Sequence, residues 1–461
     1  MTATATSTTA TLPPRHPDEA QRPSRFAFRL ALLALAGLGI RLGYVLAGGG
    51  AGTSFDGAYY HLAANVLVDG RGFVNPFNGV PTALHPPAWP ALLGLPSILG
   101  LDTLLAHQIF AGLVGAATVV AVGMAARVIA GATPGLIAAA ITAVYPNLWV
   151  RERELAAETL VFPLVAITLI LAYRFWVRPR TITFAALGGA CAVLALVRAE
   201  QAFLLVLLLL PLAVRAGQGP ALRRFLRFAA AAGVAVLVLL PWAVYNSTRF
   251  EEPVLLTTSF GVTARGANCP GAYDGAYLGS QHPDIWRPPA SAGSSGCAWD
   301  AGSAEESEQD AEFREAALAY TRERAERLPA VVAAREGRTW GVFRPFQEAV
   351  FQQDWGLQPI GVYWAGLAAY WALLPFAVVG AAHLRRHRVR LWPLLSFQAL
   401  TVVTVAITYG NVRFRAAAEV PLIVLAAVGA DALWGRLRSH DRRAATNAST
   451  TSSAPAGVTS V

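Results

Sequence analysis

Residues 103–129 read TLLAHQIFAGLVGAATVVAVGMAARVI, and Arg127 is the only formally charged side chain in this segment. About 20 consecutive apolar residues suffice to cross a bilayer as a helix. The segment therefore predicts a transmembrane helix, and similar apolar segments recur along the chain. Ten such spans are expected, at 26–47, 103–129, 132–150, 155–176, 182–198, 202–214, 225–245, 360–383, 390–409 and 416–435. The fold class predicted is an all-α polytopic membrane protein.

The composition supports this class. The 461 residues are 55% hydrophobic and 14% charged, with a mean hydropathy of +0.45, whereas soluble chains carry about 25% charged residues. Disordered, fibrous, secreted-scaffold and ordinary cytosolic classes are excluded together. All 37 basic residues are Arg. We assign the net charge of +9 to membrane topology and contacts with anionic lipids, and expect no nucleic-acid partner.

The distribution of charge predicts the orientation. With a cytoplasmic N-terminus, nineteen Arg fall in cytoplasmic segments and six in the short outer loops, as the positive-inside rule requires. Of the 28 acidic residues, only four lie on the cytoplasmic side. We therefore expect both termini in the cytoplasm and a carboxylate-rich extracytoplasmic face.

Five regions follow from these spans. The ends, 1–25 and 439–461, have low complexity and are predicted to be disordered and cytoplasmic. Between them we expect a membrane module at 26–245 with a first extracytoplasmic loop at 48–102, a second extracytoplasmic region at 246–359, and C-terminal helices at 360–438. No internal repeat is visible, whereas many secondary transporters have two related halves.

The three cysteines divide between the membrane and the large outer loop. Cys191 lies in an apolar span, while Cys269 and Cys297 both lie in the second extracytoplasmic region. That environment favours disulfides, so we predict a Cys269–Cys297 bridge. Two unpaired thiols remain the alternative, because the sequence does not fix their separation.

The first outer loop combines a carboxylate with an amphipathic segment. Asp56 is followed by AYYHLAANVLVDG (58–70), whose apolar residues recur at helical spacing, which predicts a helix in the membrane interface. Its rings with polar tips, at Tyr59, Tyr60 and His61, are expected at headgroup depth. The Pro-rich segment 85–100 is expected to re-enter or skim the bilayer.

Six ordered motifs carry a resemblance to a known family. They are FDGAYYHLAANVLVDGRGF (55–73), HPPAWPALLG (85–94), RELAAETLVFPL (153–164), ALVRAEQAFLLVLLLLP (195–211), PWAVYNSTRFEEPVLLTTSFG (241–261) and YGNVRFRAAAEVPLIVLAA (409–427). This set is similar to bacterial glycosyltransferases of the GT-C superfamily, in the family 39, dolichyl-phosphate-mannose protein mannosyltransferase-like group. The resemblance extends from Phe26 to Trp434 and matches an amphipathic outer helix of the family to residues 312–345.

The resemblance implies a GT-C fold in the bacterial plasma membrane. It also implies transfer of a sugar from a polyprenyl-phosphate donor to a glycan, lipid or protein acceptor at an extracytoplasmic active site. One position departs from the family. The protein mannosyltransferases carry an Asp-Glu pair in the first loop, whereas Gly57 follows Asp56 here, so neither a protein acceptor nor a mannose donor is carried over.

Displacement of a polyprenyl phosphate requires a base for the acceptor hydroxyl and compensation for the phosphate charge. Asp56 is the predicted catalytic base, and its alternative role is the N-cap of the following helix. Glu158 is the second candidate carboxylate and could orient the acceptor or a cation; the alternative is an ordinary interfacial glutamate.

Arginine suits a phosphate because its guanidinium is always charged and forked. The candidates are Arg198 with Glu200, and Arg413 with Arg415. Their alternatives are an Arg-Glu pair that caps a tight turn and a side chain that snorkels at the bilayer edge. The predicted substrate-binding residues are Tyr59, Tyr60, His61, His85, Glu158, Arg198, Glu200, Arg413 and Arg415.

No cofactor is required by this chemistry, but a divalent cation remains possible. His61 and His85 could form a metal site with Asp56, although the sequence has no closely spaced ligand motif. A membrane permease or lipid flippase is the alternative function, and an accessory subunit with the same fold is a third. Membrane lipids are expected partners in each case.

Overall fold

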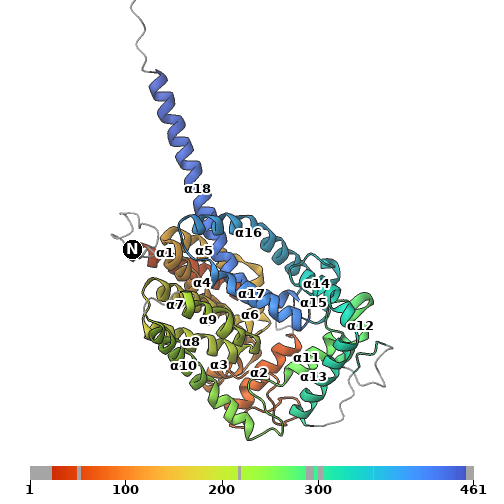
Figure 1. Cartoon of the computed structure of the whole chain (residues 1–461). Helices are drawn as coiled ribbons and strands as arrows, with labels where there is room; N and C mark the ends of the chain where they lie inside the picture. The colour runs from red at the N-terminus through yellow and green to blue at the C-terminus, as the bar shows by residue number, and fades with distance from the viewer. Residues whose placement is uncertain are drawn as a thin grey trace, which may run out of the picture.

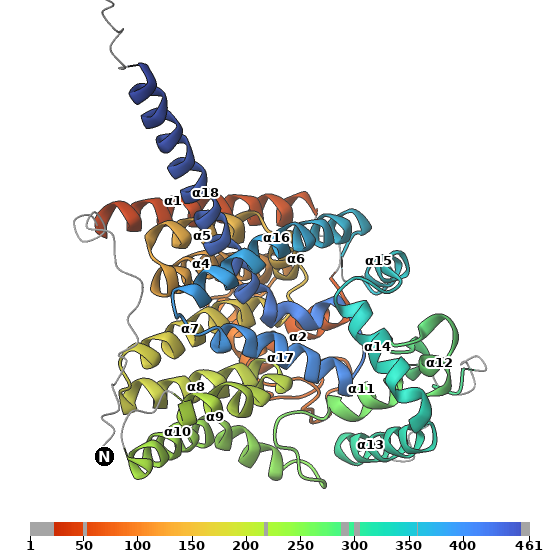
Figure 2. The same ribbon diagram turned by 45° about the horizontal axis from the view of Figure 1, so that its top comes forward.

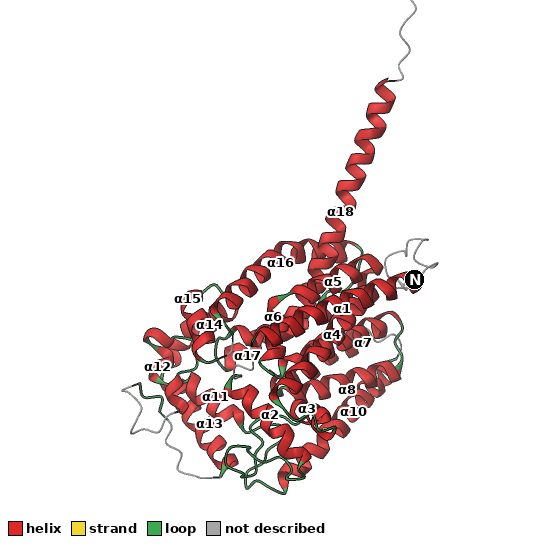
Figure 3. Cartoon of the chain, turned by 180° about the vertical axis from the view of Figure 1, so that it is seen from behind, coloured by secondary structure: helices red, strands yellow, loops and turns green. Residues whose placement is uncertain are grey.

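The computed structural model describes residues 23–48, 53–215, 220–286, 295–298, 305–356 and 358–452, with side chains in the last helix described as far as Arg438. Within these residues the chain is helical, and its only β pairing is an isolated bridge between Val74 and Pro81 (Figure 3). The predicted all-α fold class is confirmed.

Six helices of the described chain are long and apolar enough to cross a membrane. They are α1 (Pro23–Ala47), α4 (Leu104–Ala130), α7 (Glu158–Val177), α10 (Ala221–Ser247), α16 (Ile360–Arg386) and α18 (Ala416–Ser452). Shorter apolar helices include α3 (Ala88–Ile98), α5 (Ala132–Val144), α8 (Thr181–Val197) and α17 (Trp392–Ile407). Each of the ten predicted spans is thus helical, but four are shorter than a full crossing.

Two of the predicted spans are interrupted. The span at 132–150 divides at Tyr145, which adopts an extended conformation before Pro146, as proline disfavours helix in the preceding residue. The short helix α6 (Pro146–Arg153) follows. The span at 202–214 consists of a 3₁₀ turn η2 (Ala199–Phe203), a π-helical turn η3 (Leu205–Leu209) and α9 (Leu210–Arg215).

The bundle is centred on α4 and α18. α4 packs against α1, α5 and α7, while α18 packs against α16, α5 and α7 (Figure 1). Gly380 and Gly429 allow the backbones of α16 and α18 to approach closely, because a Cβ at either position would overlap the facing helix. A buried ion pair of 2.8 Å between Arg41 and Glu152 joins α1 to α6, so Arg41 is a helix-packing residue.

The end of α18 extends beyond the bundle (Figure 1). Its backbone is helical to Ser452, so part of the tail predicted to be disordered forms helix. The predicted disorder at 1–22 and 453–461 lies outside the described residues.

The two regions predicted to be extracytoplasmic, called the outer regions below, gather at one end of the bundle (Figure 2). The first contributes α2 (Phe55–Val68) and α3, and the second contributes α11 (Ser259–Ala267), α12 (Pro270–Tyr273), α13 (Glu306–Glu323), α14 (Leu328–Thr339) and α15 (Pro345–Asp354). The single helix expected at 312–345 is divided at Arg324, and α14 restarts with Pro329 in its first turn. Cys269 and Cys297 are bonded to each other beside α12.

Candidate active site

A cavity of about 860 Å³ lies where the two outer regions meet the bundle. Six of the predicted site residues line it, namely Asp56, Tyr60, His85, Arg198, Glu200 and Arg413. They come from α2, the loop before α3, the turn after α8 and the 3₁₀ helix η8 (Val412–Arg415). Segments more than 350 positions apart in the sequence therefore meet at one site.

Charged side chains in the cavity wall form one connected network. Arg413 donates hydrogen bonds to Asp56 Oδ2 at 2.9 Å and to Glu158 Oε1 at 3.0 Å. Arg198 donates to the same Glu158 oxygen at 2.7 Å and also pairs with Glu200. Glu158 is fully buried, whereas the Asp56 side chain is 29% exposed. Glu158 thus holds the two arginines from behind, and Asp56 faces the cavity.

The turn before α7 positions Glu158. Leu155 has a φ of 51°, an uncommon left-handed conformation for a residue with a side chain. Its side chain is fully buried, and its carbonyl oxygen accepts a hydrogen bond of 2.6 Å from Trp89 Nε1. α7 then begins at Glu158, where the helix dipole stabilises a carboxylate.

The N-terminus of α2 positions Asp56. The N-cap is Ser54, whose Oγ accepts a hydrogen bond of 3.2 Å from the Gly57 amide. The alternative role of Asp56 as N-cap is therefore wrong, and its carboxylate is available to Arg413. A Cβ at Gly57 would overlap Thr53 and the carbonyl oxygen of Glu154, so the glutamate that the protein mannosyltransferases carry after this aspartate has no room here.

His85 packs against two tyrosine rings of α2. Its ring centroid lies 4.8 Å from that of Tyr59 and 4.8 Å from that of Tyr60, and its Nδ1 lies 3.2 Å from Tyr60 Oη. Burial, with the nearby Asp56, raises the pKa of Tyr60 far above its ordinary value, so the hydroxyl keeps its proton at neutral pH. The tautomer of His85 decides which of the two atoms donates in this hydrogen bond. Burial and the two arginines lower the pKa of His85, although Asp56 opposes them.

The electrostatics of Asp56 reflect two opposing effects. Burial favours the neutral acid, but the positive charge of Arg413, the imidazole of His85 and the Arg413 hydrogen bond outweigh burial and lower the pKa of Asp56. The carboxylate is therefore ionised at neutral pH.

Four predicted site residues lie outside the cavity lining: Glu158, which is buried behind the two arginines, and Tyr59, His61 and Arg415. The ring of Tyr59 packs edge-on against the imidazole of His85. His61 bonds His107, with their Nδ1 atoms 3.0 Å apart, and it does not line the cavity with His85 and Asp56, the two residues with which it could have formed a metal site. Arg415 is buried and donates to Glu419 at 2.7 Å, which makes it part of the packing between η8 and α18.

The two tyrosine rings of α2 are buried in the protein. Tyr59 and Tyr60 are each only 4% exposed, because α2 packs against α3 and the proline-rich loop instead of lying free in the interface. Among the described residues, no group of three or more His, Cys, Asp and Glu side chains is arranged to hold a metal ion.

The outer wall of the cavity consists of residues that the sequence did not single out. They include Thr257, Ser259, Phe260, Thr263, Gln281, His282, Trp286, Trp355, Tyr409 and Asn411. Most belong to the second outer region. Thr257, Ser259 and Phe260 lie in the motif at 241–261, but no motif or periodic pattern distinguishes the others in this region from the side chains of an ordinary loop. Tyr409 and Asn411 lie in the same motif as Arg413, so the sequence did contain a reason to consider them.

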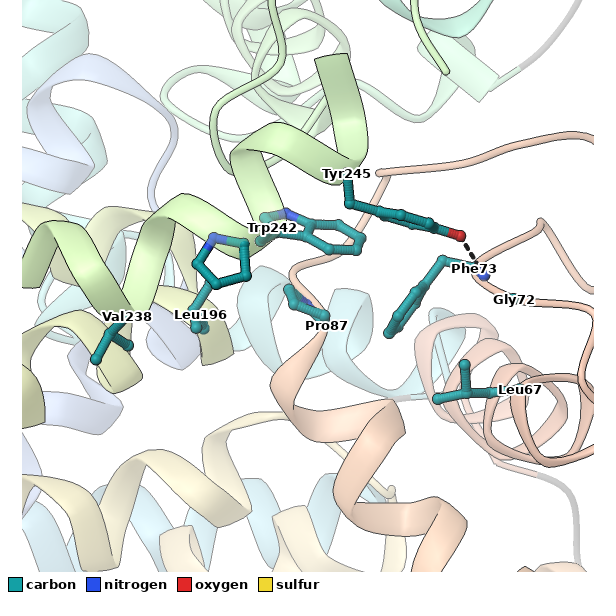
Figure 4. Close-up of a pocket in the computed structure, with 9 residues that line it drawn as sticks. Leu67, Gly72, Phe73, Pro87, Leu196, Val238, Trp242 and Tyr245 are labelled. Atoms are coloured by element: carbon teal, nitrogen blue, oxygen red, sulfur yellow. Dashed lines mark hydrogen bonds between the residues drawn. The ribbon is translucent and has the colours of Figure 1, made fainter. Parts of the chain in front are cut away.

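A second, almost wholly apolar groove of about 440 Å³ lies beside the cavity. Figure 4 shows Trp242 and Tyr245 of α10 facing Phe73 and Pro87 of the first outer loop. The other lining residues are Leu67, Gly72, Leu196, Val238 and Pro241. Pro86 and Val197 line the charged cavity, and their neighbours Pro87 and Leu196 line the groove. Adjacent residues of two short segments therefore line the two hollows.

Comparison with known proteins agrees with this architecture. The sequence profile of the dolichyl-phosphate-mannose-protein mannosyltransferases matches residues 84–245. No curated protein matches the sequence. The oligosaccharyltransferase of Archaeoglobus fulgidus in the apo form is similar in structure, with a TM-score of 0.54 at 13% identity over 93% of this chain and 52% of that chain.

The same archaeal enzyme, tethered to an acceptor peptide containing the NVT sequon, gives a TM-score of 0.51 at 13% identity over 91% of this chain and 51% of that chain. The chain has the GT-C fold. The resemblance predicted from the six motifs is thereby confirmed at the level of the fold. This GT-C chain spans about half the length of the oligosaccharyltransferase. The matched profile includes His85, Glu158 and Arg198 and begins after Asp56.

Proposed function

We propose that this protein is a membrane glycosyltransferase that moves a sugar from a polyprenyl phosphate to an extracytoplasmic cell-envelope acceptor. The observation that carries the proposal is the pairing of Asp56 with Arg413 in a cavity beside an apolar groove. A base, a phosphate site and a surface for a lipid chain are then within reach of one substrate. The name of the matching mannosyltransferase family supports a lipid-phosphate donor.

The reaction is a direct displacement at the anomeric carbon. Asp56 accepts the proton of the acceptor hydroxyl, whose oxygen forms the new bond to the anomeric carbon. The bond between that carbon and the phosphate oxygen breaks, and its electron pair leaves with the polyprenyl phosphate. Attack opposite the leaving group inverts the anomeric configuration. The leaving group is already a stable anion, so no general acid is required.

Arg198 and Arg413 compensate the phosphate charge. Both are held by the buried Glu158, which fixes their guanidinium groups before the substrate arrives. Arg413 also holds Asp56 when the site is empty. A donor phosphate competes for Arg413, so binding of the donor weakens the ion pair and increases the basicity of Asp56.

The apolar groove suits the isoprenoid chain of the donor. It contacts the charged cavity through adjacent residues, and the polar side chains are turned out of it. Trp242, for example, donates its indole N–H to the carbonyl oxygen of Leu256 at 2.8 Å. A lipid whose phosphate contacts Arg198 would pass Pro87 and Leu196 to reach the surface of α10.

The location of the protein is part of the proposal. We infer a multi-pass protein of the bacterial plasma membrane with both termini in the cytoplasm and the cavity on the outer face. No protein cofactor is invoked, and a divalent cation remains compatible with the chemistry.

The test is a transfer assay with purified full-length protein in lipid nanodiscs. Radiolabelled polyprenyl-phosphate mannose, galactose and arabinose are supplied separately with total extracted cell-envelope acceptors, with EDTA or MgCl₂ in parallel. We expect one donor to give labelled product or free sugar, and the Asp56→Asn variant to form both at least about 100-fold more slowly. Asp69→Asn, at the exposed end of α2, is the matched control. No turnover with any donor, together with lipid movement across vesicles, would show a flippase instead.

A further inference from the structure

A row of stacked aromatic rings ends in the cavity. Tyr277 stacks on Phe351 with centroids 5.0 Å apart and an interplanar angle of 3°, and Phe351 stacks on Trp355 at 5.6 Å and 13°. His282 packs against Tyr277, with centroids 4.4 Å apart and an interplanar angle of 57°. Trp355 and His282, at the two ends of the row, both line the cavity. Phe351 covers one face of Trp355, and the indole remains partly exposed.

The backbone fixes the indole at this position. Trp355 is the C-cap of α15, and the following Gly356 has a φ of 67°, the left-handed conformation that commonly ends a helix. A Cβ at Gly356 would lie 3.6 Å from the Cα atom of Ser54, the N-cap of α2. The backbone beside Trp355 thus approaches the turn that carries Asp56.

The helix that carries Trp355 is also tied to the phosphate site. Gln352 of α15 donates a hydrogen bond of 3.1 Å to Asn411 Oδ1, and the same Asn411 oxygen accepts from the Arg413 amide at 2.9 Å. Trp355, Asp56 and Arg413 therefore lie on segments that contact one another directly.

The cavity wall near the aromatic row differs from the wall near Glu158. The charged side chains of the lining, Asp56, Arg198, Glu200 and Arg413, belong to the ion network. Gln281, Thr263 and Trp286, which line the cavity in the second outer region, offer neutral polar or aromatic groups. A flat ring with polar groups at its edge matches a sugar, which has an apolar C–H face and peripheral hydroxyls.

We propose that Trp355 is the stacking platform of an acceptor subsite and that the acceptor is an uncharged saccharide. This inference rests on the proposed transferase function and narrows its acceptor to a glycan. A ring stacked on Trp355 can turn one hydroxyl towards Asp56. The donor sugar is held separately, through its phosphate at Arg198 and Arg413.

The experiment compares acceptor and donor kinetics in the Trp355→Ala, Trp355→Phe and wild-type proteins in nanodiscs. The acceptor probes are manno-, galacto- and arabinotetraose, a Ser/Thr-rich peptide and a diacylglycerol. Hydrolysis of the donor by water is measured without any acceptor. Trp371→Ala, an exposed indole on α16 outside the cavity lining, is the matched control.

We expect a tetrasaccharide to be the best acceptor and Trp355→Ala to raise its KM by about 10-fold. Trp355→Phe should restore most of the affinity, because it keeps a flat ring. The donor KM and the rate of donor hydrolysis should not change, which also shows that the variants fold. A rise in the donor KM alone, an unchanged acceptor KM, or preference for the peptide or the diacylglycerol would overturn the proposal. Absence of both transfer and hydrolysis in the wild-type protein would instead contradict the transferase function itself.

Discussion

Arg413 Nη1 lies 2.9 Å from Asp56 Oδ2, although 357 positions separate the two residues in the sequence. The same guanidinium bonds Glu158, which has no exposed surface. Arg413 therefore connects the carboxylate that faces the cavity with the carboxylate buried behind it. Because a phosphate would compete for this guanidinium, the pair provides a direct link between donor binding and the state of the base.

Replacement of Asp56 by Asn should separate chemistry from folding. The variant keeps the shape of the side chain but loses the basic oxygen, so we expect transfer to fall about 100-fold to 10,000-fold. Thermal stability should change little, because Ser54 and not Asp56 caps α2. Ser54→Ala should show the converse pattern, with a loss of about 1 kcal/mol in helix stability and a smaller loss of activity. Near-normal transfer by Asp56→Asn would instead direct attention to Glu158 as the base.

Removal of Arg413 should affect both stability and activity. Arg413→Ala leaves part of the charge of the buried Glu158 uncompensated, a change that typically costs about 3–5 kcal/mol. The double variant with Glu158→Gln should recover part of that loss, as measured by thermal unfolding in detergent. Arg413→Lys should retain only part of the transfer rate, because an ammonium group cannot make the two parallel hydrogen bonds that a planar guanidinium makes. Equal stability of Arg413→Ala and the exposed control Arg71→Ala would contradict the role assigned to the network.

The pH dependence should differ between the free enzyme and the donor complex. Arg413 and His85 lower the pKa of Asp56 below its ordinary value of 3.8, so the carboxylate stays ionised on acidification until the pH falls below that value. kcat/KM, which reports the free enzyme, should therefore have its acidic limb below about pH 4. A bound phosphate engages Arg413 and raises the pKa, so the limb of kcat should lie at higher pH. Coincident limbs in the two profiles would show that donor binding leaves the Asp56 ion pair intact.

The proposal that the groove binds the isoprenoid chain can be tested with donors whose chains differ in length. Val238→Trp fills the groove, whereas Leu237→Trp changes a neighbouring side chain that is 69% exposed and does not line it. We expect Val238→Trp to raise the KM of an undecaprenyl-phosphate sugar by about 10-fold or more, with little effect on a donor of two isoprene units. The reason is that, on the proposed path, the shorter chain is not expected to reach Val238. An equal effect on both donors would place the long chain elsewhere.

The orientation can be measured by labelling single cysteines in intact cells. Cysteines at exposed Asn78 and Gly275, in the two outer regions, should react with a membrane-impermeant maleimide. A cysteine at Leu437 in α18 should react only after the membrane is opened. This pattern follows from the distribution of Arg and acidic residues, and labelling of Leu437 in intact cells would reverse the proposed topology.

The sequence was most informative where one local pattern sufficed. A run of apolar residues must satisfy its backbone hydrogen bonds internally in a membrane, so each of the ten predicted spans is helical. Their lengths were harder to predict. Pro146 divides one span, and the π-helical turn at Leu205–Leu209 interrupts another, because short-range geometry is decided there by packing as well as by composition.

For the candidate site, too, the sequence predicted some residues and left others undecided. Residue chemistry alone identified Asp56, Glu158, Arg198 and Arg413, because charged groups at the ends of apolar spans are expensive unless they are paired or used. The sequence could not distinguish Arg413 from Arg415, two positions apart, since the 3₁₀ turn directs the first to Asp56 and the second to Glu419.

The sequence by itself determined the class of the protein, its apolar spans and the residue types able to handle a phosphate, because hydropathy and charge are properties of short segments. Only the tertiary structure decided which charges meet, which rings line the cavity and where the apolar groove opens. Those features depend on contacts between segments far apart in the chain, such as Asp56 with Arg413 and Gly356 with Ser54. Such contacts arise from the packing of whole helices, and no local pattern of residues encodes them.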